Sequence, residues 1–170
     1  MNLQSKHLIG ITSEHVRERL SYSPSTGIFR WKTNRKSRLV GEIAGTNAGT
    51  AIKIHIAGRV YMAHRLAWLY MTGSFPEDLI DHINLNPLDN RWMNLRRADK
   101  RQNAQNCGVR ADNKSGFKGV CWDKRVGKWR ADIRLSDARK HLGMFEDPKE
   151  ASEAYVMAAI KYFGEYGRST

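Results

Sequence analysis

Residues 81–103 constrain the fold of this 170-residue chain most strongly, because turn-forming residues separate two short segments that can each form a strand. The segment reads DHINLNPLDNRWMNLRRADKRQN. Five residues that favour turns lie between His82 and Asn94, namely Asn84, Asn86, Pro87, Asp89 and Asn90. Asp99 is a suitable helix N-cap, so a helix is expected to begin after Ala98. The pattern predicts a strand, a long polar loop, a short strand and a helix across residues 79–106.

The same segment brings together the side chains that phosphodiester hydrolysis requires. The reaction needs a nucleophilic water, neutralisation of the phosphate charge and help for the leaving oxygen; a divalent ion supplies the last two. A neutral imidazole such as that of His82 supplies the first, as a general base. Asp81 and Asn103 offer hard oxygen ligands, which suit Mg²⁺ or Mn²⁺. We therefore expect one such ion per site, and the alternative is a turn-rich loop that merely carries an exposed histidine.

A structural zinc site is not expected. Cys107 and Cys121 are the only cysteines, and no C-x2-C or H-x3-H spacing accompanies them. Two cysteines in a chain of this composition are expected to be free thiols.

Asp81-His82, Asn94-Leu95-Arg96 and Asn103 together resemble the HNH nuclease motif, most closely that of phage and intron-encoded homing endonucleases. The stretches LSYSPSTGIFRWK, GEIAGT and HRLAWLYMTGSFP also resemble the amino-terminal part of such phage enzymes, so the resemblance covers about residues 13–106. It implies a ββα-metal fold that clamps one ion. His82 would be the general base, Asp81 and Asn103 the metal ligands, and Asn94 the member of the catalytic group that braces the loop. Asn103 stands where many HNH enzymes have a histidine.

Basic residues close to the motif are candidate phosphate contacts. We expect Arg91, Arg96 and Arg97 to contact DNA, and the alternative for each is a solvated surface side chain. His64 lies on an apolar face, which favours a core or supporting role over a catalytic one.

The rest of the first half is predicted from capping and turn residues. The expected elements are a helix over 13–20 capped by Ser13, a turn at Pro24 and Gly27, a strand over 28–31, a loop over 32–50, a hairpin over 51–61 and a buried helix over 62–72.

The last third of the chain predicts a small sheet with one helix. Strands are expected over 116–122, 128–135 and 140–145, and the spacing of apolar residues predicts a helix over 149–163. Within 128–134, Trp129, Ala131 and Ile133 alternate with charged residues, so one face of the sheet is apolar and the other largely basic.

Residues 115–167 resemble the AP2 DNA-binding domain, through SGFKGVCWDKRVGKWRADIR and HLGMFEDPKEASEAYVMAAIKYFGEY. The resemblance implies a three-stranded antiparallel sheet in the DNA major groove with the helix behind it. The implied DNA contacts are Lys118, Arg134, Arg139 and His141, and strand alternation adds Trp122 and Arg130. Cys121 and Asp123 differ from the plant members, so base preference does not carry over.

The overall charge agrees with a polyanionic partner. The formal net charge is +12 and the isoelectric point about 10.0, which favours double-stranded DNA. No apolar run is long enough to cross a membrane, and the first twenty residues do not resemble a signal peptide. We therefore expect no membrane association and a cytoplasmic location, in the host cell if the chain is phage-encoded.

The predicted fold class is α+β, with an HNH nuclease domain over 1–106 (its ββα-metal core about 79–106), a connector over 107–115 and an AP2-type domain over 116–170. The predicted function is a metal-dependent, sequence-selective, homing-type DNA endonuclease that nicks as a monomer or cuts both strands as a homodimer. The alternative is a DNA-binding regulator with an inactive nuclease fold. A third reading is a nucleic-acid packaging protein, which the charge alone would allow.

Overall fold

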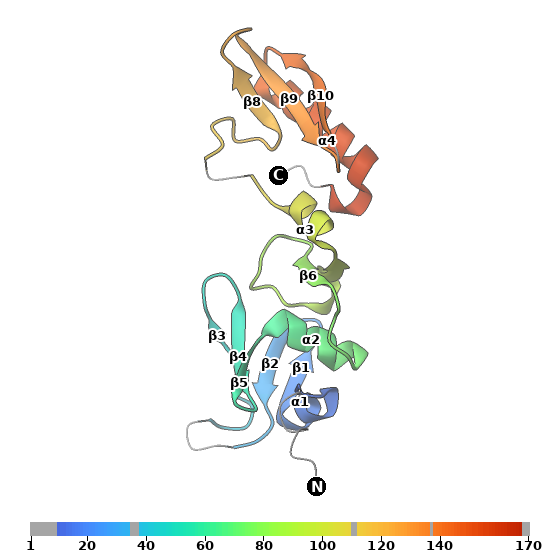
Figure 1. The fold of residues 1–170 in the computed structure, drawn as a ribbon. Helices are drawn as coiled ribbons and strands as arrows, with labels where there is room; N and C mark the ends of the chain where they lie inside the picture. Colours follow the sequence, from blue (N-terminus) through green and yellow to red (C-terminus); the bar gives the residue numbers. More distant parts are fainter. Residues whose placement is uncertain (1–9, 35–37, 110–111, 137, 168–170) are drawn as a thin grey trace. The chain divides into compact units, whose positions relative to one another are not determined.

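The computed structural model describes residues 10–34, 38–109, 112–136 and 138–167. The chain divides into two compact units, Met1–Ala98 and Asp99–Thr170 (Figure 1). Both units combine helices with antiparallel strands, so the mixed α and β class is confirmed. The predicted domain limits, with a connector at 107–115, stay a prediction, and residues 110 and 111 of that connector lie outside the described residues.

In its described residues, 10–34 and 38–98, the first unit contains two α-helices and three small sheets. Its elements are α1 (Ser13–Arg19), β1 (Leu20–Ser23), β2 (Ile28–Trp31), β3 (Thr46–Asn47), β4 (Ile52–Ile56), β5 (Arg59–Met62), α2 (Ala63–Thr72), β6 (Leu79–His82), the 3-10 turn η1 (Trp92–Asn94) and β7 (Leu95–Ala98). Strands β1 and β2 form a hairpin, β3, β4 and β5 form a sheet, and β6 pairs with β7.

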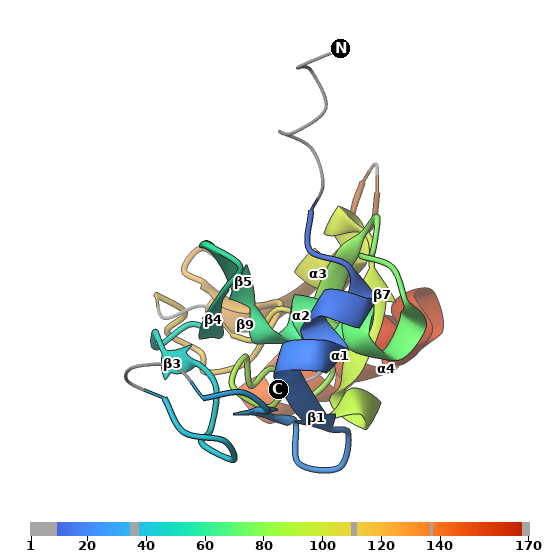
Figure 2. The ribbon, with the colours of Figure 1, turned by 90° about the horizontal axis from the view of Figure 1, so that it is seen from below.

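One apolar core holds the first unit together. Phe29, Leu20, Ile54, Leu66 and Val16 are almost completely buried in it. Helices α1 and α2 lie side by side (Figure 2), which brings the apolar faces of both onto the same core. Ile80 of β6 and Leu95 of β7 join this core, so the two strands that carry the motif are anchored to it.

The second unit is a three-stranded antiparallel sheet with a helix along one face (Figure 1). Its elements are α3 (Lys100–Asn106), β8 (Val120–Asp123), β9 (Lys128–Arg134), β10 (Arg139–Phe145), α4 (Pro148–Phe163) and η2 (Gly164–Tyr166). The sheet order is β10-β9-β8, and Ala131 and Ile133 of β9 are buried against α4. Asp99 caps α3 in a capping box with Gln102, as expected for a helix that begins after Ala98.

Several local expectations were wrong. Thr12, not Ser13, caps α1, because its extended backbone lets the hydroxyl accept from the His15 backbone N–H. Residues 32–50 contain the short strand β3, and β1 begins at Leu20, where a helix end was expected. Strand β8 starts at Val120 rather than 116, because the preceding residues form a turn. Gly119 has φ +73° there, and a Cβ on it would lie 2.1 Å from the ring of Tyr155.

No helix in the described part of the chain is both long and apolar enough to span a membrane.

Candidate functional site

Strands β6 and β7 place Asp81 and His82 side by side at a buried position. Asp81 is opposite Arg96 in the strand pair, and His82 is opposite Leu95. Only 6% of Asp81 and 9% of His82 is exposed. The Arg96 Nε lies 2.9 Å from the Asp81 Oδ2, so a buried guanidinium balances the charge of the carboxylate and fixes its orientation.

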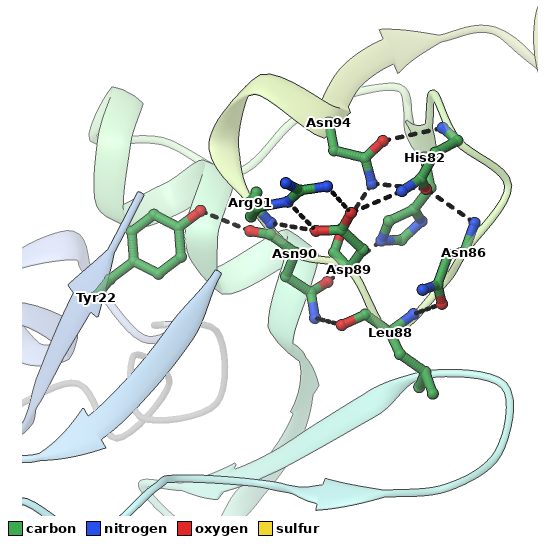
Figure 3. A network of polar contacts seen from close by, with 9 residues as sticks. Tyr22, His82, Asn86, Leu88, Asp89, Asn90, Arg91 and Asn94 are labelled. Atoms are coloured by element: carbon green, nitrogen blue, oxygen red, sulfur yellow. Dashed lines mark hydrogen bonds and ion pairs between the residues drawn. The ribbon is translucent and has the colours of Figure 1, made fainter. Parts of the chain in front are cut away.

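Asn94 braces the loop that connects the two strands (Figure 3). Its Nδ2 donates to the Asp89 backbone oxygen at 2.7 Å and to the Asn84 Oδ1 at 2.9 Å. Its Oδ1 accepts from the Asn84 backbone N–H at 2.9 Å. These three bonds tie both ends of the loop to η1, and Asn94 is itself buried. Its membership of the catalytic group stays a prediction.

Asp89 is the charged centre of the same loop. Its carboxylate accepts from the Arg91 guanidinium at 2.8 and 2.6 Å and from the Asn84 Nδ2 at 2.6 Å (Figure 3). The hydrogen bond from Arg91 is the main reason that the pKa of Asp89 is lowered to about 2, and the bond from Asn84 adds to it. The Asp89 carboxylate therefore stays ionised at neutral pH and keeps these hydrogen bonds within the loop.

Asn90 holds the imidazole of His82. The His82 Nε2 lies 3.3 Å from the Asn90 Oδ1, and the Asn90 Nδ2 donates to the Leu88 backbone oxygen at 3.2 Å. Because the amide nitrogen faces a carbonyl, the atom that faces His82 is the amide oxygen, which only accepts. This arrangement favours the tautomer of the neutral ring in which Nε2 carries the proton.

His64 of α2 packs against His82 from another side. The two ring centroids are 5.1 Å apart and the ring planes are nearly perpendicular, at 84°. The His64 Nδ1 is buried and has no hydrogen-bond partner among the residues that the structure describes. Burial and the neighbouring His82 lower the pKa of His64 to about 4, so this ring is neutral near pH 7. The structure thus places His64 beside the candidate base, in a supporting position.

The remaining predicted metal ligand, Asn103, lies on α3 in the second unit, whereas Asp81, His82 and Asn94 lie in the first. That Asn103 joins Asp81 in a metal site stays a prediction.

The three arginines predicted to contact DNA are each paired with a carboxylate within the first unit. Arg91 pairs with Asp89 at 2.6 Å, Arg96 with Asp81 at 2.9 Å and Arg97 with Asp78 at 2.6 Å. Arg91 and Arg97 are about half exposed, but the side chain of Arg96 is 11% exposed. Arg96 is therefore placed to orient Asp81, which the sequence did not indicate.

In the second unit, three of the predicted DNA contacts converge on one carboxylate of the sheet. Asp132 lies 2.9 Å from Arg130, 4.0 Å from Arg139 and 3.1 Å from His141. Arg134 follows on the same strand and is exposed.

The other two predicted contacts in this unit differ in their surroundings. Trp122 is 48% exposed, and its ring lies 5.1 Å from that of Trp129. Lys118 is half-buried, and its Nζ donates to the backbone oxygens of Gln105 and Cys107, both at 2.6 Å. Burial also lowers the pKa of Lys118. Lys118 therefore binds backbone oxygens at the end of α3, a structural role that was not predicted.

The two predicted ligands are oxygen donors, which suit a hard divalent ion better than zinc. Asp81 offers a buried, oriented carboxylate and Asn103 an amide oxygen, and Mg²⁺ and Mn²⁺ prefer such oxygens. Among the described residues, no three His, Cys, Asp or Glu side chains gather as a metal-binding group.

Comparison with known proteins gives matches to the HNH endonucleases. The HNH endonuclease family profile matches residues 61–105, the segment that carries α2, β6, the braced loop, β7 and most of α3. Protein 3.8 of Escherichia phage T7 is 34% identical over 106 residues, which cover 62% of this chain and 87% of that protein. An uncharacterized HNH endonuclease of Acanthamoeba polyphaga mimivirus is 26% identical over 110 residues, which cover 64% of this chain and 56% of that protein.

No solved structure matches the chain. The profile match ends at residue 105, so the AP2 resemblance of residues 115–167 stays a prediction. The profile match and the identity to the phage protein agree with the buried Asp81-His82 pair and its asparagine-braced loop: this chain belongs to the HNH endonuclease family.

Proposed function

We propose that this chain is a metal-dependent, sequence-selective DNA endonuclease of the homing type, with the hydrolytic site at Asp81 and His82. The observation that carries the proposal is the orientation of His82. Its ring is buried beside Asp81, and its Nε2 lies 3.3 Å from the Asn90 Oδ1, which orients the imidazole as the general base. Double-stranded DNA is the proposed substrate, in keeping with the net charge of +12.

Each of the proposed site residues has its own task in hydrolysis. His82 removes a proton from the attacking water, and Asn90 and His64 hold its ring. Asp81 and Asn103 would hold one Mg²⁺ or Mn²⁺, which when bound neutralises the phosphate and stabilises the leaving oxygen. Arg96 orients the Asp81 carboxylate, and Asn94 fixes the loop. The products are a 5′-phosphate and a 3′-hydroxyl, as the family resemblance implies.

We infer that the sheet of the second unit reads the DNA sequence in the manner of an AP2 domain. Its support is a sheet with α4 on one face and Arg130, Arg134, Arg139 and His141 on its strands. A β-sheet in the major groove presents such side chains to base edges. Because one chain carries one His82, a monomer nicks a single strand, and a double-strand cut needs a homodimer or two successive nicks. The proposed location is the cytoplasm, that of the host cell if the chain is phage-encoded.

The test is His82→Ala, assayed on phage genomic DNA with Mg²⁺ or Mn²⁺ and followed by sequencing of the ends. Loss of the general base should slow cleavage by about 10²-fold or more, while DNA binding measured without metal changes little. His55→Ala is the matched control, because His55 is an exposed histidine on β4 of the same unit. Undiminished cutting by His82→Ala would contradict the assignment. If the wild type binds DNA but cuts it with neither Mg²⁺ nor Mn²⁺, the alternative function, a DNA-binding regulator with an inactive nuclease fold, would be favoured.

A further inference from the structure

The β1–β2 hairpin, which precedes the matched segment 61–105, contacts the loop beside His82. The Tyr22 hydroxyl donates to the Asn90 backbone oxygen at 2.7 Å (Figure 3). The Trp92 backbone N–H donates to the Pro24 backbone oxygen at 2.9 Å. The hairpin thus bonds the backbone on both sides of Arg91, more than sixty residues away in the sequence.

The turn of the hairpin lies directly against the same stretch of backbone. Gly27 has φ +73°, and a Cβ placed on it would lie 2.4 Å from both the Arg91 backbone nitrogen and the Asn90 carbonyl carbon. Real side chains do not approach so closely, so the loop reaches its position only because residue 27 has no side chain.

Asn90 transmits this contact to His82. Asn90 is 2% exposed, its backbone oxygen accepts from Tyr22, and its side-chain oxygen lies 3.3 Å from the His82 Nε2. Any displacement of the Asn90 backbone therefore moves the acceptor that orients the imidazole. Tyr22 is suited to this task because burial raises the pKa of its hydroxyl to about 12, so it remains a donor at every working pH.

We propose that the β1–β2 hairpin is a positioning element of the nuclease: Tyr22 and Gly27 set the place of Asn90 and, through Asn90, the orientation of the His82 ring. Neither residue contacts the reacting atoms. The inference rests on the proposed function, because it assigns the hairpin to the catalytic step.

Tyr22→Phe tests the hydrogen bond, because it removes one hydroxyl and leaves the ring in the core. We expect the rate of nicking of supercoiled plasmid DNA with Mn²⁺, at saturating protein, to fall about tenfold or more through misplacement of His82. The protein concentration for half-maximal rate should stay the same. Tyr70→Phe is the matched control, since its ring lies 5.7 Å from that of Tyr22 in the same aromatic cluster. Equal rates for the two variants would overturn the proposal.

Gly27→Ala tests the close approach, with Gly58→Ala as its control. Both glycines have positive φ, +73° and +76°, so alanine strains both turns equally, but only at position 27 does the new methyl meet the loop. We expect Gly27→Ala to lose most of the nicking rate and Gly58→Ala to keep it, and equal rates would contradict the inference.

A second readout does not depend on cleavage. Long-range ¹H–¹⁵N spectra of the metal-free full chain, in mildly alkaline buffer, report which ring nitrogen of His82 carries the proton. Wild type and Tyr70→Phe should show the proton on Nε2, and Tyr22→Phe should show a mixture of the two tautomers. If the wild type does not cut, the proposed function fails. If the wild type cuts, His82→Ala does not, and Tyr22→Phe behaves as wild type in rate and spectrum, only the role of the hairpin fails.

Discussion

At the scale of single residues, His64 is held neutral by the fold. Burial in the core of the first unit and the adjacent His82 ring lower its pKa from 6.5 to about 4. The unfolded chain therefore takes up a proton at this residue near pH 6.5, whereas the folded chain takes it up only near pH 4. The contribution of neutral His64 to stability is complete above about pH 6.5 and is lost as the pH falls towards 4.

This residue predicts how the stability of the protein responds to acid. The whole effect is at most about 3 kcal/mol of unfolding free energy, at 1.36 kcal/mol for each pH unit. Between about pH 7 and pH 5, the free energy of unfolding measured with urea should fall by about 2 kcal/mol more for the wild type than for His64→Phe. The phenylalanine cannot titrate, and it keeps an aromatic ring beside His82. Parallel stability curves for the two proteins would show that His64 is not held neutral.

At the scale of elements, β9 carries the residue proposed to read base edges most directly. Arg134→Ala should weaken binding to the recognised sequence by ~1–3 kcal/mol and relax selectivity there. Arg125→Ala removes the same charge from an exposed position in the turn before β9 and is the matched control. The measurement is a binding competition between the recognised DNA and unrelated DNA. A loss in Arg134→Ala that is uniform across all sequences would assign Arg134 to a phosphate instead.

The elements also show what the sequence could and could not predict. Alternation in β9, the spacing in α4 and the Asp99 cap are local signals, and the structure has those elements where they were expected. The start of β8 was misjudged because Gly119 is fixed by a ring on a distant helix, that of Tyr155. The pairings of Asp81 with Arg96, and of Tyr22 with Asn90, join residues 15 and 68 positions apart. Nothing in the neighbouring residues indicates such contacts, so these two pairings were not predicted, whereas the loop-bracing role of Asn94 and a supporting role for His64 were.

At the scale of the whole molecule, the charge should dominate binding to DNA. With a formal net charge of +12, the logarithm of affinity should fall linearly with the logarithm of salt concentration, with a slope of about −0.9 for each phosphate neutralised. Fluorescence anisotropy of labelled duplex DNA without metal measures this slope. Affinity that is insensitive to salt would rule out phosphate contacts as the main attraction.

Asp132 has a consequence for how such a protein would travel along DNA. A sheet that carried only cationic side chains would bind any DNA duplex tightly and dissociate from it slowly. Here Arg130, Arg139 and His141 already face an internal carboxylate. If the sheet binds DNA as proposed, an unrelated duplex competes with Asp132 for these side chains and dissociates sooner, whereas a target that also offers base-edge hydrogen bonds is retained. Asp132 would then lower the affinity for non-specific DNA and shorten the search for the target.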